Sequence, residues 1–346
     1  MSDGVIVNIA SPRTSTLALV FPPPMPNRRR APIISALLVL GLAACSGEQP
    51  SANAGPGADS LALRAAAAFD GAAAMTYLHT ALQFGTRVPG SAGHKATGDW
   101  IVAQMTARGA TVSEQTWLHT TKGGKPVPMR NIIAQWNPAA TTRVLYVTHW
   151  DTRPKAEKAP PADTLKPIVG ANDGTSGIAL FLAIGDALKV KPTAIGVDLV
   201  FVDGEDYGEF GPPEVDVFIG STYFAQHLPA AGYKPEFAVV WDMIGDRSLQ
   251  IFQETISLDV APEVVARVWR RSEALGYAGK FIQQPKYSVR DDHVALQAVG
   301  IKAIDVIDID YPYHHTLEDT EDKVSLESMQ VVGTVAVSLI RELEKP

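Results

Sequence analysis

The chain has 346 residues, and its 30 Lys and Arg against 37 Asp and Glu give a formal net charge of −7. Because 46% of the residues are hydrophobic, the chain can bury a full-sized core, which excludes a disordered or fibrous protein. The acidic balance argues against nucleic acid as a partner, and the lack of an apolar run of about 18 residues excludes a membrane-spanning protein.

The first predicted feature is an export signal. Arg28, Arg29 and Arg30 precede an apolar run over residues 31–44, which ends at Cys45 and a polar segment. Small residues before a lone cysteine resemble a bacterial lipoprotein processing site; a buried helix with an incidental cysteine is the alternative. We therefore expect residues 25–44 to be a signal peptide that starts at Met25, and Cys45 to carry the lipid. Residues 1–24 have no assigned role.

The segment after the cysteine refines this expectation. Ser46, in place of an aspartate, favours the outer membrane, so we expect an exported lipoprotein on the periplasmic side of that membrane. Residues 45–60 are rich in Gly, Pro, Ala and Ser, which is typical of a flexible tether. Membrane contact is expected only through the lipid anchor. A single cysteine also excludes an internal disulfide and a metal site with several thiolate ligands.

Residues 61–346 are predicted to form one catalytic domain, because no internal repeat and no second Pro/Gly-rich linker divides them. Short apolar runs predict buried strands at 144–147, 197–202, 237–240 and 303–307. Helical spacing predicts helices at 177–188, 262–275 and 326–343, the last with Ser325 as its N-cap. Strands that alternate with helices predict an α/β fold, a single three-layer α/β/α sandwich with a mixed, largely parallel central sheet.

Polar side chains cluster where the predicted strands end, which is where ligands bind in an open α/β sheet. They are His149, Asp151, Asp173, Glu205, Asp206, Asp242, Asp246, His314 and His315. Each has a plainer interpretation: an isolated strand-end histidine, a helix cap, a solvated acidic loop or a surface histidine. Their recurrence at successive strand ends favours a metal site instead, and carboxylates mixed with imidazole favour catalytic zinc.

These segments also carry a family resemblance. In chain order they read H-W-D-T-R-P (149–154), G-A-N-D-G-T-S-G (170–177), D-G-E-D-Y-G (203–208), W-D-M-I-G-D (241–246), D-D-H (291–293) and Y-H-H-T-x-E-D (313–319). The series resembles the bacterial glutaminyl cyclase branch of the family-28 zinc metallopeptidases, over roughly residues 69–343. That resemblance implies the zinc aminopeptidase (phosphorylase/hydrolase-like) fold, with N-termini of peptides or proteins as the partners.

Matched residue by residue, the resemblance implies zinc ligands at Asp173, Asp206 and His315. It makes Glu205 the general acid and base beside the metal. In two-zinc aminopeptidases of this family, the positions of His149 and Asp242 hold a second ion with Asp173 as the bridge. We therefore expect one zinc ion, with ligands for a second present.

The resemblance also implies an acidic network and a substrate pocket. Asp291 would share protons with Glu205 and Asp242, since clustered carboxylates raise each other's pKa. The pocket would be lined by four residues, Trp150, Tyr311, Tyr313 and His314. His314 stands where cyclases typically have Trp, so the other three residues are expected to supply the aromatic surface.

Two chemistries fit this machinery. A glutaminyl-peptide cyclotransferase would convert an N-terminal Gln to pyroglutamate with release of ammonia, whereas an aminopeptidase would hydrolyse the first peptide bond with one or two zinc ions. The Asp291-Asp292-His293 pattern favours the cyclase. A third hypothesis, a lipid-anchored binding protein without catalysis, would need a missing base or ligand, and none is missing.

Overall fold

The computed structural model describes residues 58–344, which belong to one compact unit. The predicted signal peptide and Cys45 lie outside the described residues. Residues 58–60 do not belong to a tether, because they begin the first helix, α1 (Ala58–Ala67). None of the described helices is long and apolar enough to cross a membrane.

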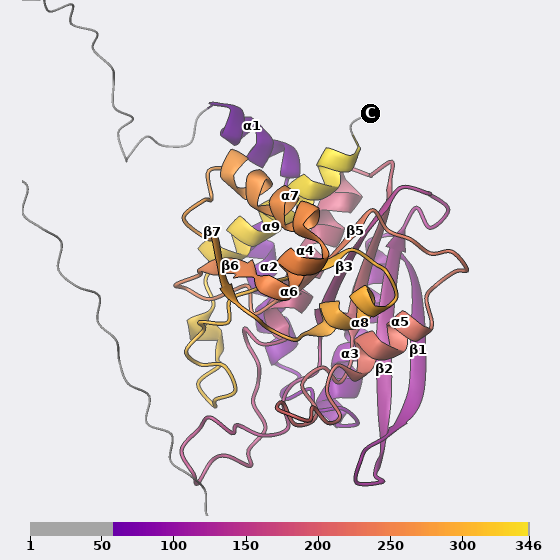
Figure 1. The fold of residues 1–346 in the computed structure, drawn as a ribbon, viewed down its shortest axis with the longest axis vertical. Coiled ribbons are helices and arrows are strands. Elements are labelled where there is room, and N and C mark those ends of the chain that lie inside the picture. The colour runs from indigo at the N-terminus through magenta and orange to yellow at the C-terminus, as the bar shows by residue number, and fades with distance from the viewer. Residues whose placement is uncertain (1–57, 345–346) are drawn as a thin grey trace, which may run out of the picture. The chain divides into compact units, whose positions relative to one another are not determined.

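A six-stranded sheet runs through the centre of the described region (Figure 1). Its strands, in spatial order, are β1 (Thr111–Thr120), β2 (Pro126–Trp136), β4 (Gly196–Val202), β3 (Arg143–His149), β5 (Phe237–Asp242) and β8 (Ala303–Ile307). The ladder from β4 through β3 and β5 to β8 is parallel, while β1 and β2 form an antiparallel hairpin that pairs with β4 in the antiparallel sense. The predicted mixed, largely parallel sheet is confirmed.

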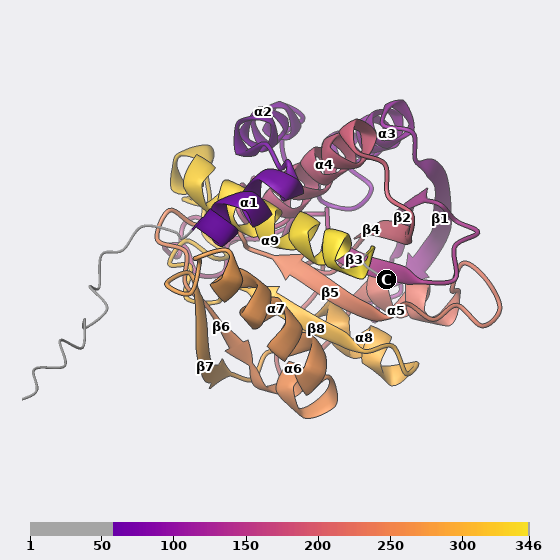
Figure 2. The ribbon, with the colours of Figure 1, turned by 90° about the horizontal axis from the view of Figure 1, so that it is seen from above.

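Helices cover both faces of this sheet (Figure 2). On one face lie α2 (Gly71–Leu82), α3 (Ala92–Ala107), α4 (Thr175–Val190) and α9 (Leu326–Leu343), and on the other lie α5 (Ile219–Gln226) and α8 (Asp292–Ala298). The helix α9 has the predicted bounds, and the Ser325 Oγ accepts a hydrogen bond from the backbone N–H of Ser328 at 3.1 Å, as an N-cap should. The arrangement is the predicted three-layer sandwich.

Side-chain alternation along the strands divides the core in two. Val144 and Tyr146 of β3 pack into the larger cluster with α4 and α9, whereas Leu145 and Val147 pack into the smaller cluster with α5 and α8. Because both faces of β3 are covered, all seven of its residues are buried. This explains why the sequence of the central strands is apolar without alternation.

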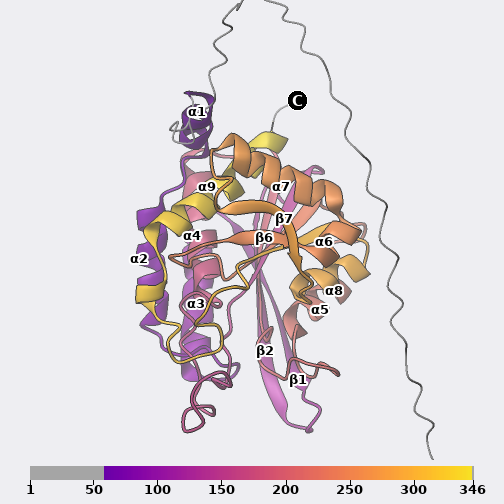
Figure 3. The same ribbon diagram turned by 60° about the vertical axis from the view of Figure 1, so that its left-hand side comes forward.

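A second, two-stranded sheet was not predicted. Its strands β6 (Ile251–Glu254) and β7 (Phe281–Tyr287) are parallel and flank α6 (Thr255–Val260) and α7 (Pro262–Ala274) in the chain (Figure 3). The exposed, polar sequence of β7 carries no apolar run, so periodicity could not reveal it. The remaining described element is a short 3₁₀ turn, Glu321–Lys323.

The close approach of α4 to β3 depends on Gly177. A Cβ on this residue would lie 1.8 Å from the Thr148 Oγ1, which is held in place by a 2.9 Å hydrogen bond to the Trp241 carbonyl. Gly177 thus brings the first turn of α4, and with it the preceding Asp173, against the ends of β3 and β5.

We predict that Gly177→Ala lowers the free energy of unfolding by roughly 1–3 kcal/mol, because the overpacking outweighs the gain of about 0.5–1 kcal/mol in helix propensity. Urea unfolding measures this. Gly279→Ala is the matched control, since no atom of the described chain lies within 4 Å of a Cβ built there. We expect the control to stay within about 0.5 kcal/mol of the wild type. An equally small effect of Gly177→Ala would contradict the packing argument.

Candidate active site

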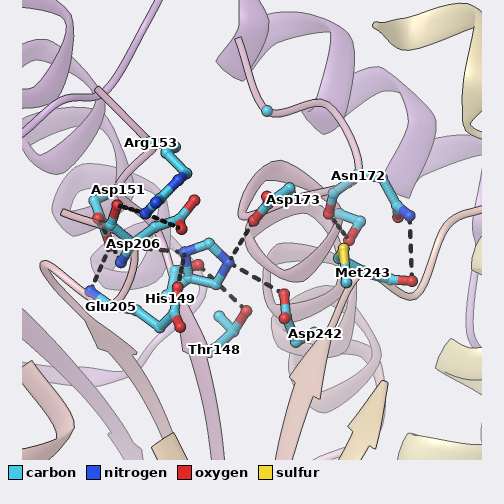
Figure 4. A network of polar contacts seen from close by, with 12 residues as sticks. Thr148, His149, Asp151, Arg153, Asn172, Asp173, Glu205, Asp206, Asp242 and Met243 are labelled. Carbon is cyan, nitrogen blue, oxygen red and sulfur yellow. Dashed lines mark hydrogen bonds and ion pairs between the residues drawn. The ribbon is translucent and has the colours of Figure 1, made fainter. Parts of the chain in front are cut away.

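The carboxyl ends of β3 and β5 bring three predicted residues together. The Nε2 of His149 lies 3.1 Å from the Asp173 Oδ1 and 3.1 Å from the Asp242 Oδ1 (Figure 4). His149 ends β3, Asp242 ends β5, and Asp173 lies just before α4. All three are buried, so the parallel strands place one imidazole between two carboxylates.

The second predicted group lies on the other side of Asp173. The Nε2 of His315 is 3.1 Å from the Asp206 Oδ1 and 3.7 Å from the Asp173 Oδ2. Asp173 therefore offers one oxygen to each histidine, as the bridging position predicted for it requires. His315 has a φ of 58°, a left-handed conformation that is uncommon for a non-glycine residue and is often found at functional sites.

Asp173 does not act as a helix cap. The N-cap of α4 is Gly174, with no side-chain cap hydrogen bond. The backbone N–H groups of Asn172 and Asp173 instead donate to the carboxylate of Asp319, at 2.9 and 3.1 Å. Asp319 thus fixes the turn that aims Asp173 between the two histidines.

Two residues without a predicted role hold His315 in place. The Glu157 Oε1 lies 2.8 Å from the Nδ1 of His315, and Arg153 Nε donates to both Glu157 carboxylate oxygens, at 2.6 and 2.7 Å. Burial raises the pKa of Glu157, but the hydrogen bonds from His315 and Arg153 outweigh it and hold the pKa well below its usual range. A carboxylate on Nδ1 leaves Nε2 free for a ligand, an arrangement typical of metal-bound histidines.

Asp151 and Arg153 position the Glu205-Asp206 turn. The Asp151 carboxylate accepts hydrogen bonds from the backbone N–H groups of Glu205 and Asp206, at 3.1 and 3.3 Å. Arg153 Nη1 donates to the backbone carbonyl of Asp206 at 2.9 Å and reaches its Oδ1 at 3.3 Å. The turn is therefore a fixed, buried structure and not a solvated acidic loop.

The three predicted catalytic carboxylates form an electrostatically strained cluster. Burial raises the pKa of Glu205 well above its usual range, and the carboxylates of Asp206 and Asp291 raise it further. Burial likewise raises the pKa of Asp291, with Asp242 as the next cause. Burial also raises the pKa of Asp242 above its usual value. Buried carboxylates whose pKa values are raised in this way suit both the acceptance and the delivery of a proton.

Around His149, burial and the neighbouring carboxylates have opposite effects on the pKa of the imidazole. Burial lowers the pKa of this imidazole, yet the carboxylates of Asp242, Asp151 and Asp173 raise it well above the usual range. Buried carboxylates around the imidazole stabilise a positive charge there, either a proton on the ring or a bound cation.

The described residues fit a metal ion. The Oδ2 atoms of Asp173 and Asp206 are buried and have no hydrogen-bond partner among the described residues. Two sets offer ligand atoms within 4.8 Å of one another: His149 with Asp173 and Asp242, and Asp173 with His314 and His315. Carboxylate and imidazole are donors that zinc accepts.

The second of these sets differs from the predicted triad, because it contains His314 in place of Asp206. The ammonium of Lys158 lies 2.7 Å from the Nδ1 of His314, so that nitrogen already accepts a hydrogen bond. Asp206 contacts His315 directly at 3.1 Å and keeps one oxygen without a partner. The contact of Asp206 with His315 and its unpartnered oxygen make Asp206 suitable as the third ligand beside Asp173 and His315.

A cavity of about 200 Å³ opens onto these groups. It is lined by Lys158, Asp173, Glu205, Phe210, Asp242, Met243, Val289, Arg290, Asp291, Ile307, Ile309, His314 and His315. The cavity brings the three predicted catalytic carboxylates to one space with Asp173 and His315, two of the predicted zinc ligands; Asp206 and His149 do not line it. Phe210, Met243 and Ile307 supply an apolar wall that sequence reasoning missed, because they lie in separate loops and at a strand end.

Three of the four predicted pocket residues do not line this cavity. Trp150 is fully buried, where its ring stacks on His94 and its Nε1 donates to the Arg130 carbonyl at 3.0 Å. Tyr311 is buried and its hydroxyl donates to Asp319 at 2.6 Å. Tyr313 packs edge-on against Tyr311. These aromatic residues support the site from behind, and only His314 faces the cavity.

Comparison with known proteins shows which family and which solved structures the chain resembles. The profile of peptidase family M28 matches residues 131–340. The glutaminyl cyclase of Porphyromonas gingivalis has 36% sequence identity and a TM-score of 0.76, over 79% of this chain and 98% of that one. A leucine aminopeptidase precursor from Bacteroides thetaiotaomicron has 31% identity and a TM-score of 0.76, over 79% of this chain and 97% of that one.

A curated relative supports the same assignment. The glutaminyl-peptide cyclotransferase-like protein of Bos taurus is 23% identical over 268 residues, which cover 68% of this chain and 66% of the bovine protein. The match thus spans slightly less than two thirds of that relative. With the zinc-type ligand set at the carboxyl edge of the sheet, these similarities show that the chain belongs to peptidase family M28.

Proposed function

We propose that the protein is a glutaminyl-peptide cyclotransferase, which converts an N-terminal glutamine of a peptide or protein to pyroglutamate with release of ammonia. The observation that carries the proposal is the cluster of Glu205, Asp242 and Asp291 in one cavity beside the ligand set. The similarity to the Porphyromonas gingivalis glutaminyl cyclase supports it.

Asp173, Asp206 and His315 are the residues that would hold one zinc ion. The unpartnered Oδ2 atoms of Asp173 and Asp206 fit this role, as does the His315 Nε2, which faces both carboxylates while Glu157 holds the Nδ1. A zinc ion there supplies Lewis-acid polarisation of the side-chain amide carbonyl of the substrate.

Glu205 performs the proton transfers. It accepts a proton from the N-terminal amine as the nitrogen attacks the side-chain amide carbon, and it returns a proton to the departing ammonia as the carbon–nitrogen bond of the amide breaks. The raised pKa of Glu205 suits both directions of transfer. Asp242 and Asp291 share the proton with Glu205, because neighbouring buried carboxylates do not all ionise together.

A second candidate is an aminopeptidase with one or two zinc ions. The observation that favours it is the compact set of His149, Asp173 and Asp242, whose ligand atoms lie within 4.8 Å of one another. The similar leucine aminopeptidase precursor also points to this activity. In that reaction Glu205 would activate water against the first peptide carbonyl, and free N-terminal residues would be the product.

The activity test offers purified protein peptides that begin with Gln, Leu or Ala, and identifies products by mass spectrometry. We expect the Gln peptide alone to lose ammonia, and Glu205→Gln to lower kcat by about 10²–10⁴-fold, as loss of a general base typically does. Glu209→Gln, on the exposed side of the same loop where Glu209 pairs with Lys155, should match the wild type. Release of free Leu or Ala would identify the aminopeptidase, and a fully active Glu205→Gln would contradict the assigned base.

The zinc site has its own test. Glu157→Gln should weaken zinc binding by about 10–100-fold, because Glu157 orients His315 from behind. Competition with a zinc chelator measures the affinity without reference to activity, and Glu209→Gln is again the control. Metal analysis of the wild type beside His149→Ala distinguishes one ion from two: we expect one zinc ion per chain in both, whereas two ions in the wild type and one in His149→Ala would show a second site. Unchanged zinc affinity in Glu157→Gln would contradict this site.

We also propose that the chain is exported and anchored by a lipid on Cys45, on the periplasmic side of the outer membrane. The support comes from the sequence: the basic run, the apolar run over residues 31–44 and the lone cysteine. These residues lie outside the described part of the structure.

We expect fatty-acid labelling of the wild type in a bacterium that sorts lipoproteins to its outer membrane, and no labelling of Cys45→Ala. Ser46→Asp is the matched variant: it should keep the label but move the protein to the inner membrane fraction. Labelled Cys45→Ala, or unlabelled wild type, would contradict the lipid anchor.

A further inference from the structure

The cavity at the active site has opposite charges at its two ends. Its inner side chains are the buried carboxylates of Asp173, Glu205, Asp242 and Asp291. Its exposed lining residues include two cations, Lys158 and Arg290. A ligand that enters therefore meets positive charge at the mouth and negative charge at the inner end, which suits a molecule with an amine at its leading end and a carboxylate behind it.

The two cations at the mouth are not equivalent. Arg290 Nε donates to Glu214 at 2.8 Å, so a neighbouring carboxylate already compensates its charge. The Lys158 ammonium instead donates to the Nδ1 of His314 at 2.7 Å, and no carboxylate among the described residues pairs with it. A neutral imidazole accepts the hydrogen bond without cancelling the positive charge. Lys158 is therefore the cation that remains available to a ligand.

The backbone keeps this lysine next to the site. The N–H of Lys158 donates to the carbonyl of His315 at 3.3 Å, and the preceding residue, Glu157, contacts the His315 ring. The loop that bears Lys158 is thus tied to a residue of the ligand set, and the hydrogen bond to His314 holds the ammonium in the lining of the cavity.

We propose that Lys158 is a specificity-determining residue that binds a carboxylate next to the N-terminal glutamine, so that peptides with Glu or Asp as their second residue are the preferred substrates. A cavity of about 200 Å³ is smaller than the ~300–1,000 Å³ typical of pockets that enclose a whole small ligand. It admits the glutamine, and the second residue lies at the mouth beside Lys158. The inference rests on the proposed cyclotransferase function.

The test compares amidated peptides Gln-Glu-Ala, Gln-Gln-Ala and Gln-Lys-Ala, with Glu and Gln as isosteres that differ in charge. We expect kcat/KM for Gln-Glu-Ala to exceed that for Gln-Gln-Ala by about fivefold, as one partly exposed ion pair provides. The gain should lie in KM and shrink in high salt, while Gln-Lys-Ala is the poorest substrate. A Gln-Ala dipeptide with a free C-terminus tests whether a terminal carboxylate binds in the same way as an acidic side chain.

The variants assign the effect to one residue. Lys158→Met should bring the Glu-to-Gln ratio close to one, and Lys158→Arg should retain the preference. Lys166→Met is the control, because Lys166 belongs to the same loop but pairs with Asp163 outside the cavity. Cyclisation without preference in the wild type, or a preference that survives in Lys158→Met, would overturn the inference and leave the cyclotransferase intact. No cyclisation of any peptide would overturn the proposed function and this inference with it.

Discussion

The structure of the active site depends on one electrostatic constraint. Several carboxylates are buried close together at the carboxyl edge of the sheet, and each of them must either stay ionised or share a proton with a neighbour. Isolated buried charges are costly, and several of the carboxylates here are compensated by particular partners. Asp151 accepts two backbone N–H groups of the Glu205-Asp206 turn, Asp319 accepts those of Asn172 and Asp173, and Arg153 joins Glu157 to Asp206. Among the buried atoms left without a hydrogen-bond partner, the Oδ2 atoms of Asp173 and Asp206 are those that would face the metal ion. Negative charge thus remains uncompensated at Asp173 and Asp206, where a cation can bind.

The parallel part of the sheet brings these carboxylates together in one site. Because β4, β3, β5 and β8 run in the same direction, the segments that follow them meet at one edge, and His149, Asp242 and the Glu205-Asp206 turn arrive there together. Gly177 then allows α4 to approach β3 closely enough to place Asp173 between His149 and His315. The same geometry serves a cyclase and an aminopeptidase. The nucleophile that reaches the substrate carbonyl distinguishes them.

The positive charge of Lys158 at the mouth of the cavity would select among peptides, which the acidic interior does not do. Carboxylates at the inner end suit an amine, which every peptide N-terminus has, so they do not distinguish one peptide from another. In the proposed complex Lys158 lies beside the second residue of the substrate, and no carboxylate of the described residues pairs with its ammonium group. Catalysis and discrimination would therefore reside in different side chains, one set buried and general, the other exposed and selective.

Sequence by itself determined the four parallel strands β3, β4, β5 and β8, the helices α4, α7 and α9, the layered fold and the residues at the strand ends, because local periodicity and the order of elements carry that information. It did not predict the β1–β2 hairpin or the other helices. It identified Asp173, Asp206, His315, Glu205, Asp242 and Asp291 as candidates, and the structure brings these residues to one edge of the sheet and its adjoining cavity. Tertiary structure alone decided which neighbours face the cavity. Trp150 and Tyr311 flank site residues in sequence, yet they point into the core, while Lys158 and Phe210 come from loops without periodicity. The direction of a loop side chain depends on long-range contacts, such as that of Glu157 with His315, which no local pattern encodes.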